Sequence, residues 1–154
     1  MPPNESLKKI IMRHEYIFVV DDDEDDRELI SDALMENHIK QNQIHLAEDG
    51  YDLISQLQDS NSLPRFILLD LNMPRMGGKE VLESIKKENR YRHIPIIIFS
   101  TSDADADIEE CYQLGCSAYL SKPSDYQSLQ DLMQATIQFW NNTSTKLLSW
   151  RERT

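Results

Sequence analysis

The chain has 154 residues, of which 40% are hydrophobic and 28% are charged. Such values are typical of one globular domain with its own core, and they argue against a disordered chain. The net charge of −11 at pH 7 argues against binding to nucleic acids or to anionic membranes, because both require a cationic surface. We therefore expect the partners to be proteins.

The apolar segments are too short to cross a membrane. The longest runs, Ile17–Val20 and Ile96–Phe99, have the length of strands, and residues 1–14 contain no visible secretory signal. Cys111 and Cys116 are too few for a disulfide framework and lack metal-ligand spacing, so both are interpreted as buried thiols in a reducing compartment. These features predict a cytoplasmic protein without membrane contact.

Strands and helices are predicted to alternate along the chain. The five predicted strands are mostly apolar and span Tyr16–Val20, Gln43–Ala47, Phe66–Leu69, Ile96–Phe99 and Ser117–Leu120. Apolar residues recur at helical spacing in Asp25–Asn37, around Leu53, Ile54 and Leu57, in Gly78–Lys87, in Asp103–Leu114, and from Leu129 to Trp140. Five such units predict an α/β fold with a parallel sheet covered by helices on both faces.

Polar side chains that suit phosphate and metal chemistry stand at the ends of four predicted strands. Asp21 and Asp22 follow the first strand, and Asp70 follows the third. Ser100 follows the fourth strand, and Lys122 comes soon after the fifth. Because ligands of parallel α/β sheets bind outside the carboxyl ends of the strands, we expect these five residues to form one site.

The chemistry of this set favours Mg²⁺ and phosphoryl transfer. Mg²⁺ takes carboxylates together with waters and phosphate oxygens, so Asp22 and Asp70 are candidate ligands, with Asp21 assisting through a water. A divalent ion or an ammonium also relieves the repulsion among clustered carboxylates. A carboxylate can act as a nucleophile and form an acyl phosphate, whose oxygens the Ser100 hydroxyl and the Lys122 ammonium could stabilise.

In their order along the chain, the segments FVVDDDEDD, ILLDLNMPRMGG, IPIIIFSTS and AYLSKPSD resemble the receiver domains of two-component response regulators. The resemblance covers about Tyr16 to Trp140. It implies a flavodoxin-like, doubly wound sheet of five parallel strands in the order 2-1-3-4-5 with five helices. It also divides the chain into an N-terminal extension (1–14), a receiver domain (15–142) and a C-terminal tail (143–154).

The resemblance implies a metal site and a phosphoacceptor. Asp70 would accept a phosphoryl group from a histidine kinase in an Mg²⁺-dependent reaction. Asp22, Asp70 and the backbone carbonyl of Asn72 would bind Mg²⁺ directly, and Asp21 would bind it through a water. No cofactor other than Mg²⁺ is expected, and the protein would signal rather than act as an enzyme.

The resemblance also implies a switch. Ser100 would move toward the phosphoryl group, and Tyr119 would turn inward in response. The Lys122–Pro123 peptide bond would be cis and would direct the ammonium toward the phosphate.

The segments STSDADADIEECYQLGCSAYLSKPSD and QFWNN resemble stand-alone regulators that partner cyanobacterial-type phytochromes. The expected partners are therefore a sensor histidine kinase, with phytochrome-type kinases among the candidates, or a phosphotransfer protein. Only NNTSTKLLSWRERT follows Trp140, which is too short for an output domain. The signal would therefore leave through protein contacts or through a relay of the phosphoryl group.

We expect those contacts to form on the fourth helix, the fifth strand and the fifth helix, as a homodimer. Phe139 is not needed for the core stripe of the last helix and is a candidate contact residue. Leu147, Leu148 and Trp150 are further candidates. The alternative is that Phe139 and Trp150 fold back on their own domain.

Three other functions fit parts of the pattern. A haloacid-dehalogenase-type enzyme needs a second Asp two residues after the nucleophile, where this chain has Asn72. A calcium-binding loop is suggested by the spacing of Asp21, Asp23, Asp25 and Asp32, but Asp26 occupies the position that requires glycine. An interaction module with an inactive site is disfavoured, because every key position carries a competent residue.

Simple structural roles are the alternatives for individual residues. Asp25 and Asp26 would suit the first turn of a helix through its dipole, and Thr101 or Ser102 would cap the helix that follows. Lys122 could be a surface lysine, and Tyr119 could be only a core aromatic.

Overall fold

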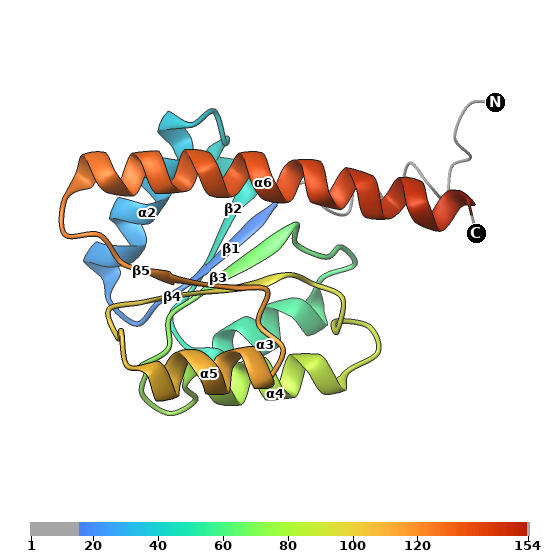
Figure 1. Ribbon diagram of the computed structural model, residues 1–154, viewed down its shortest axis with the longest axis horizontal. Helices are drawn as coiled ribbons and strands as arrows, with labels where there is room; N and C mark the ends of the chain where they lie inside the picture. Colours follow the sequence, from blue (N-terminus) through green and yellow to red (C-terminus); the bar gives the residue numbers. More distant parts are fainter. Residues whose placement is uncertain (1–15, 154) are drawn as a thin grey trace.

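The computed structural model describes residues 16–153, with side chains described up to Trp140. Strands and helices alternate along the chain, as Figure 1 shows. The strands are β1 (Ile17–Val20), β2 (Ile44–Ala47), β3 (Phe66–Leu69), β4 (Ile96–Ser100) and β5 (Ala118–Ser121). The helices are α2 (Glu24–Glu36), the short 3-10 helix η1 (Gln41–Gln43), α3 (Gly50–Asp59), α4 (Gly78–Lys87), α5 (Asp105–Gln113) and α6 (Tyr126–Arg153).

The strands form one parallel sheet in the order β2-β1-β3-β4-β5, which confirms the predicted fold. In the register of the sheet, Val20 lies beside Leu69, and Leu69 lies beside Ile98. The carboxyl ends of β1, β3 and β4 therefore meet at the same edge. Residues that follow these strands are brought together, although they lie far apart in the sequence.

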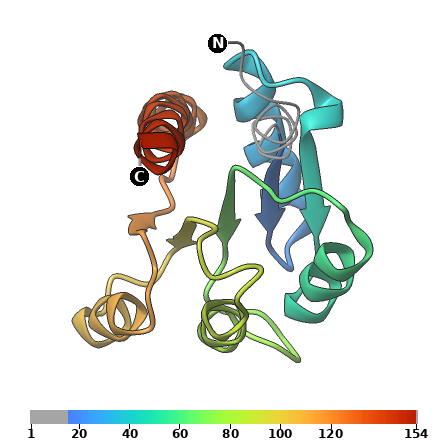
Figure 2. The same cartoon turned by 90° about the vertical axis from the view of Figure 1, so that its right-hand side faces the viewer.

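Helices cover both faces of the sheet. Figure 2 shows α3, α4 and α5 on one face and α2 and α6 on the other. Phe18 and Val20 of β1 belong to the core under α3, α4 and α5, whereas Ile17 and Val19 belong to the core under α2 and α6. A strand buried on both faces needs an apolar residue at every position, which explains the continuous apolar runs.

The last helix has the predicted buried stripe. Leu129, Met133, Thr136 and Ile137 are buried, and Leu132 and Trp140 are partly buried against the same core. The helical backbone continues to Arg153, since neither glycine nor proline interrupts this segment. The side chains of Leu147, Leu148 and Trp150, which we predicted to make contacts, lie outside the described residues.

Two helix starts differ from the prediction. Helix α2 begins at Glu24, and the carboxylate of Asp23 caps it by accepting a hydrogen bond of 3.0 Å from the Asp26 N–H. Helix α5 begins at Asp105, after Ala104, and no side chain caps it. The prediction that Thr101 or Ser102 caps this helix is wrong, because both residues lie in the loop before it.

Among the helices of the described part of the chain, none is long and apolar enough to cross a membrane.

Candidate metal and phosphoryl-acceptor site

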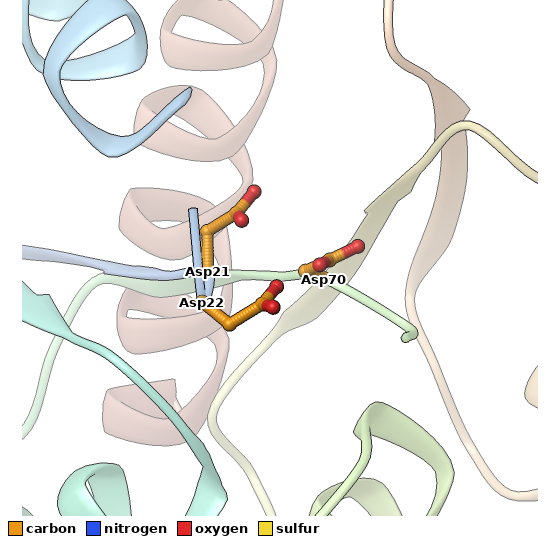
Figure 3. Close-up of side chains that lie close together, drawn as sticks. All are labelled: Asp21, Asp22 and Asp70. Atoms are coloured by element: carbon orange, nitrogen blue, oxygen red, sulfur yellow. The ribbon is translucent and has the colours of Figure 1, made fainter. Parts of the chain in front are cut away.

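Three carboxylates converge at the carboxyl edge of the sheet. Asp21 and Asp22 follow β1, Asp70 follows β3, and one oxygen of each lies within 4.8 Å of the others. Figure 3 shows these three carboxylates lying close together. Backbone hydrogen bonds extend past the strand ends, from Asp70 N–H to the Val20 carbonyl (2.9 Å) and from Asp21 N–H to the Ala47 carbonyl (3.1 Å). The sheet therefore positions both aspartates.

The carboxylates differ in their surroundings. Asp21 and Asp70 are buried, whereas Asp22 is exposed. Both oxygens of Asp21 accept hydrogen bonds: Oδ1 from the Asp23 N–H (2.9 Å) and Oδ2 from Lys122 Nζ (2.6 Å). Hard oxygen donors of this kind are the ligands that Mg²⁺ prefers, so the cluster fits this ion.

Lys122 joins the cluster from the segment after β5. Its Nζ lies 2.6 Å from Asp21 Oδ2, 3.1 Å from Asp26 Oδ2 and 3.7 Å from Asp70 Oδ1. The side chain is only 12% exposed, so Lys122 is not a surface lysine. Asp26 is a member of this site that the sequence pattern did not identify, because its place in the first turn of α2 already explained it.

The cis peptide bond expected at Lys122–Pro123 is not present, and no other cis bond occurs in residues 16–153. The trans isomer of an X–Pro bond is favoured by about 0.5–1 kcal/mol. Lys122 reaches Asp21 and Asp26 without the cis form. Its backbone is held by a hydrogen bond of 2.9 Å from the Lys122 N–H to the Ser100 carbonyl.

The carboxylates of the cluster outnumber its one ammonium group, that of Lys122. The pKa of Asp70 is raised to about 6: burial raises it most, the charges of Asp21 and Asp22 also raise it, and Lys122 opposes the rise. Burial also raises the pKa of Asp21. Burial alone would lower the pKa of Lys122, but its hydrogen bond to Asp21 and the neighbouring carboxylates raise it. One ammonium therefore does not neutralise the cluster, and a divalent cation would.

The raised pKa of Asp70 predicts that the stability of the fold depends on pH. The folded chain binds the Asp70 proton more tightly than the unfolded chain, in which the pKa is about 3.9. The resulting stability is fully present below about pH 4 and is lost as the pH rises through about 6. Without metal, we expect the unfolding free energy of the wild type to fall by about 3 kcal/mol relative to Asp70→Asn over this range. Urea unfolding of both proteins in the presence of a chelator, at several pH values, measures this difference. An unfolding free energy that changes with pH in the same way in both proteins would contradict the prediction.

Where the loop after β3 meets α4, the first residue of the helix has room only for glycine. A Cβ at Gly78 would lie 2.5 Å from the Asp70 carbonyl oxygen, and the Gly78 N–H donates to the Leu71 carbonyl at 2.9 Å. The start of α4 therefore packs directly on the backbone of Asp70. Asn72, the predicted third metal ligand, lies exposed in this loop, two residues after Asp70.

Ser102 connects the two predicted switch residues. The Oγ of Ser100, which is buried at the end of β4, accepts a hydrogen bond of 3.1 Å from the Ser102 N–H. The hydroxyl of Tyr119 donates to the Ser102 carbonyl at 2.8 Å, while the Tyr119 ring packs partly buried against the core. Tyr119 is therefore more than a core aromatic, because it also holds the loop after β4.

Ser102 also connects this loop to two helices. Its Oγ donates to Asp107 Oδ2 of α5 at 2.7 Å. Lys79 of α4 lies 2.8 Å from Asp107 Oδ1 and 2.6 Å from Glu110 Oε2. The hydrogen bond from Lys79, followed by that from Ser102, lowers the pKa of Asp107. A movement of the loop after β4 would thus affect α4, α5 and β5 together.

A five-stranded doubly wound sheet with an acidic, lysine-containing cluster at its carboxyl edge defines the class of two-component receiver domains. The chain belongs to the response regulator receiver domain family, whose pattern matches residues 17–134.

Three relatives show how far the similarity extends. Response regulator Rcp1 of Synechocystis is 31% identical over 134 residues, which cover 84% of this chain and 90% of Rcp1. The probable methanogenesis regulatory protein FilR2 of Methanothrix harundinacea is 38% identical over 79 residues, so this chain matches only about half (51%) of that relative. The crystal structure of the phosphorylated cyanobacterial phytochrome response regulator RcpA has 32% identity and a TM-score of 0.77 over 84% of this chain and 96% of RcpA.

These similarities confirm the predicted family and its resemblance to the phytochrome-associated regulators. The protein is a receiver domain of a two-component response regulator, a family whose signalling depends on phosphorylation. Receiver domains bind Mg²⁺ or Mn²⁺ at an acidic pocket, which the cluster of Asp21, Asp22 and Asp70 matches. They interact with histidine kinases or phosphotransfer proteins and generally signal rather than catalyse. This membership is inconsistent with the dehalogenase-type and calcium-loop alternatives.

Proposed function

We propose that Asp70 accepts a phosphoryl group from a sensor histidine kinase or a phosphotransfer protein, and that the protein signals by the resulting change in shape. The observation that supports this best is the arrangement of Asp70 between two other carboxylates and the Lys122 ammonium. An Asp70 carboxylate oxygen would attack the phosphorus, and the bond from phosphorus to the donor would break. The product is an acyl phosphate on Asp70.

The metal ligands we propose are the carboxylates of Asp22 and Asp70 and the backbone carbonyl of Asn72. Bound Mg²⁺ would neutralise charge on the transferring group. Asp21 would act through a water, because both of its oxygens already accept hydrogen bonds at 2.9 and 2.6 Å. Rcp1 supports a divalent ion here, since its Mn²⁺-bound structure has 31% identity and a TM-score of 0.73 over 82% of this chain and 94% of that chain.

Ser100 and Lys122 would contact the phosphoryl oxygens. The Lys122 ammonium is already within 3.7 Å of Asp70 Oδ1. The Ser100 Oγ accepts a hydrogen bond from Ser102, and its own proton can be donated to a phosphoryl oxygen. A shift of Ser100 would then pull on Ser102 and, through the Ser102 carbonyl, on Tyr119.

Labelling by a small phosphodonor tests this function. The wild type is incubated with acetyl phosphate, with Mg²⁺ or with a chelator, and its intact mass is measured. We expect one added phosphoryl group with Mg²⁺, little with the chelator, and removal of the group by hydroxylamine, which cleaves acyl phosphates. Peptide mapping after borohydride reduction should place the group on Asp70. A hydroxylamine-resistant label on another residue would overturn the proposal.

We further propose that the protein acts in the cytoplasm, without enzymatic activity of its own on other molecules. Both cysteines, Cys111 and Cys116, are buried free thiols, which suits a reducing compartment. The similarity to RcpA favours a phytochrome-type kinase as the partner. Incubation with radiolabelled candidate kinases should show the fastest transfer from a phytochrome-type kinase, and equal slow transfer from all would contradict this choice.

The output surface we propose consists of α5, β5 and α6, which would pair with a second copy of the chain. Phe139 of α6 and Tyr112 of α5 are 60% and 51% exposed, and β5 is an edge strand of the sheet. Exposed aromatic residues are common anchors of protein contacts, and two-fold pairing is the commonest oligomeric arrangement.

Sedimentation with and without beryllofluoride tests the dimer. The wild type should form a dimer, and Phe139→Ser should shift it toward the monomer by roughly tenfold or more in dissociation constant. Gln138→Ser, at an exposed neighbouring position, is the matched control and should behave as the wild type. A wild type that stays monomeric at all concentrations in both states would refute the dimer but not the receiver assignment.

A further inference from the structure

Asp26 is a fourth carboxylate at the site, and it comes from a helix rather than from a strand end. Its backbone N–H donates to Asp23 Oδ1 at 3.0 Å, which fixes the first turn of α2. From there its side chain reaches the site, where Oδ2 accepts a hydrogen bond of 3.1 Å from Lys122 Nζ. Asp26 and Lys122 are 96 positions apart in the sequence.

The Lys122 ammonium lies closer to Asp21 and Asp26 than to Asp70. An ammonium has three N–H donors, and two of them are used by Asp21 at 2.6 Å and Asp26 at 3.1 Å. Asp70 Oδ1, at 3.7 Å, is beyond hydrogen-bond distance. The ammonium thus hydrogen-bonds to Asp21 and Asp26, whereas it lies near the acceptor carboxylate without a hydrogen bond to it.

Asp26 also adds negative charge where a phosphoryl group would bring more. Asp22 and Asp70 suit metal coordination and Asp21 suits water-mediated coordination, but Asp26 has neither task in the proposed function. Its side chain is 42% exposed, which moderates its charge without removing it. A phosphoryl group on Asp70 would compete with Asp26 for Lys122 and would be repelled by it.

We infer that Asp26 is a positioning residue that restrains phosphorylation by holding the Lys122 ammonium toward α2 in the unphosphorylated protein. This inference rests on the proposed function of Asp70. The phosphorylated state gains the full benefit of Lys122 only after the contact between Lys122 and Asp26 is weakened. Asp26 thereby sets the balance between the two states without touching the metal or the phosphoryl group.

The affinity for the phosphate mimic beryllofluoride in the presence of Mg²⁺ tests the inference. Asp26→Asn should bind the mimic about two- to fivefold more tightly than the wild type, the range expected for a partly exposed ion pair. Asp25→Asn is the matched control, because it removes the same charge one position earlier from an exposed side chain. It should bind as the wild type. Equal or weaker binding by Asp26→Asn would overturn the inference.

A double-mutant cycle separates positioning from simple repulsion. In a Lys122→Ala background, the change Asp26→Asn should tighten binding less than it does in the wild type, because only the direct repulsion by Asp26 remains once the ammonium is absent. Tightening of equal size in both backgrounds would overturn the positioning role. Failure of the wild type itself to bind beryllofluoride would overturn the proposed function together with the inference. Wild-type binding with an unaltered Asp26→Asn affinity would overturn the inference alone.

Discussion

Asp70→Asn is expected to reduce labelling by acetyl phosphate or by a cognate kinase to background, a loss of roughly a hundredfold or more, while the fold is retained. The amide has nearly the shape of the carboxyl group but is not a nucleophile. The substitution also removes a buried carboxyl group whose pKa is raised to about 6, so we expect the variant to remain folded. Intact-mass spectra after incubation with Mg²⁺ and acetyl phosphate measure the label, and near-UV circular dichroism checks the fold.

Asp22→Asn is the informative comparison for this experiment. Asp22 is exposed and belongs to the same cluster, and we propose that it binds the metal without accepting the phosphoryl group. Its replacement should weaken Mg²⁺ binding and slow labelling, but the acceptor remains and the label should still appear. Equal labelling of the wild type and Asp70→Asn would show that another residue is the acceptor.

Lys122→Ala is expected to separate phosphorylation from switching. The variant should still take up phosphate, more slowly, because Asp70 and the metal ligands remain. It should not switch, because the cation that links Asp21, Asp26 and Asp70 is lost. Removing one partner of a buried ion pair is also costly, typically about 3–5 kcal/mol, although protonation of Asp21 or Asp70 and bound Mg²⁺ would reduce this cost.

Nuclear magnetic resonance of backbone amides around Ser100 and Tyr119 measures the switch. In the wild type, beryllofluoride should shift these resonances, because Ser100 and Tyr119 are joined through Ser102. In Lys122→Ala, the shifts should be small even when the mimic is bound. Lys87→Ala is the control, since Lys87 is exposed and pairs along its own helix with Glu83 at 3.0 Å. If beryllofluoride shifts these resonances in Lys122→Ala as much as in the wild type, Lys122 does not transmit the signal.

The sequence alone determined the fold and the centre of the site. Strands buried on both faces must be apolar at every position, and this local requirement made β1, β3 and β4 visible in the pattern. The carboxylates of Asp21, Asp22 and Asp70 could be assigned to one site because each follows a strand, and the carboxyl ends of parallel strands meet at one edge. The order of these motifs also identified the family.

Only the tertiary structure decided which side chains complete the site. The contact of Asp26 with Lys122, the bridge from Lys79 to Asp107 and Glu110, and the central place of Ser102 depend on how helices and loops pack against the sheet. Charged residues in first turns and loops occur for many reasons, so their type and spacing carried no signal for these contacts. The trans form of the Lys122–Pro123 bond was equally undetermined, because surroundings and not local sequence select between X–Pro isomers whose free energies differ by only about 0.5–1 kcal/mol.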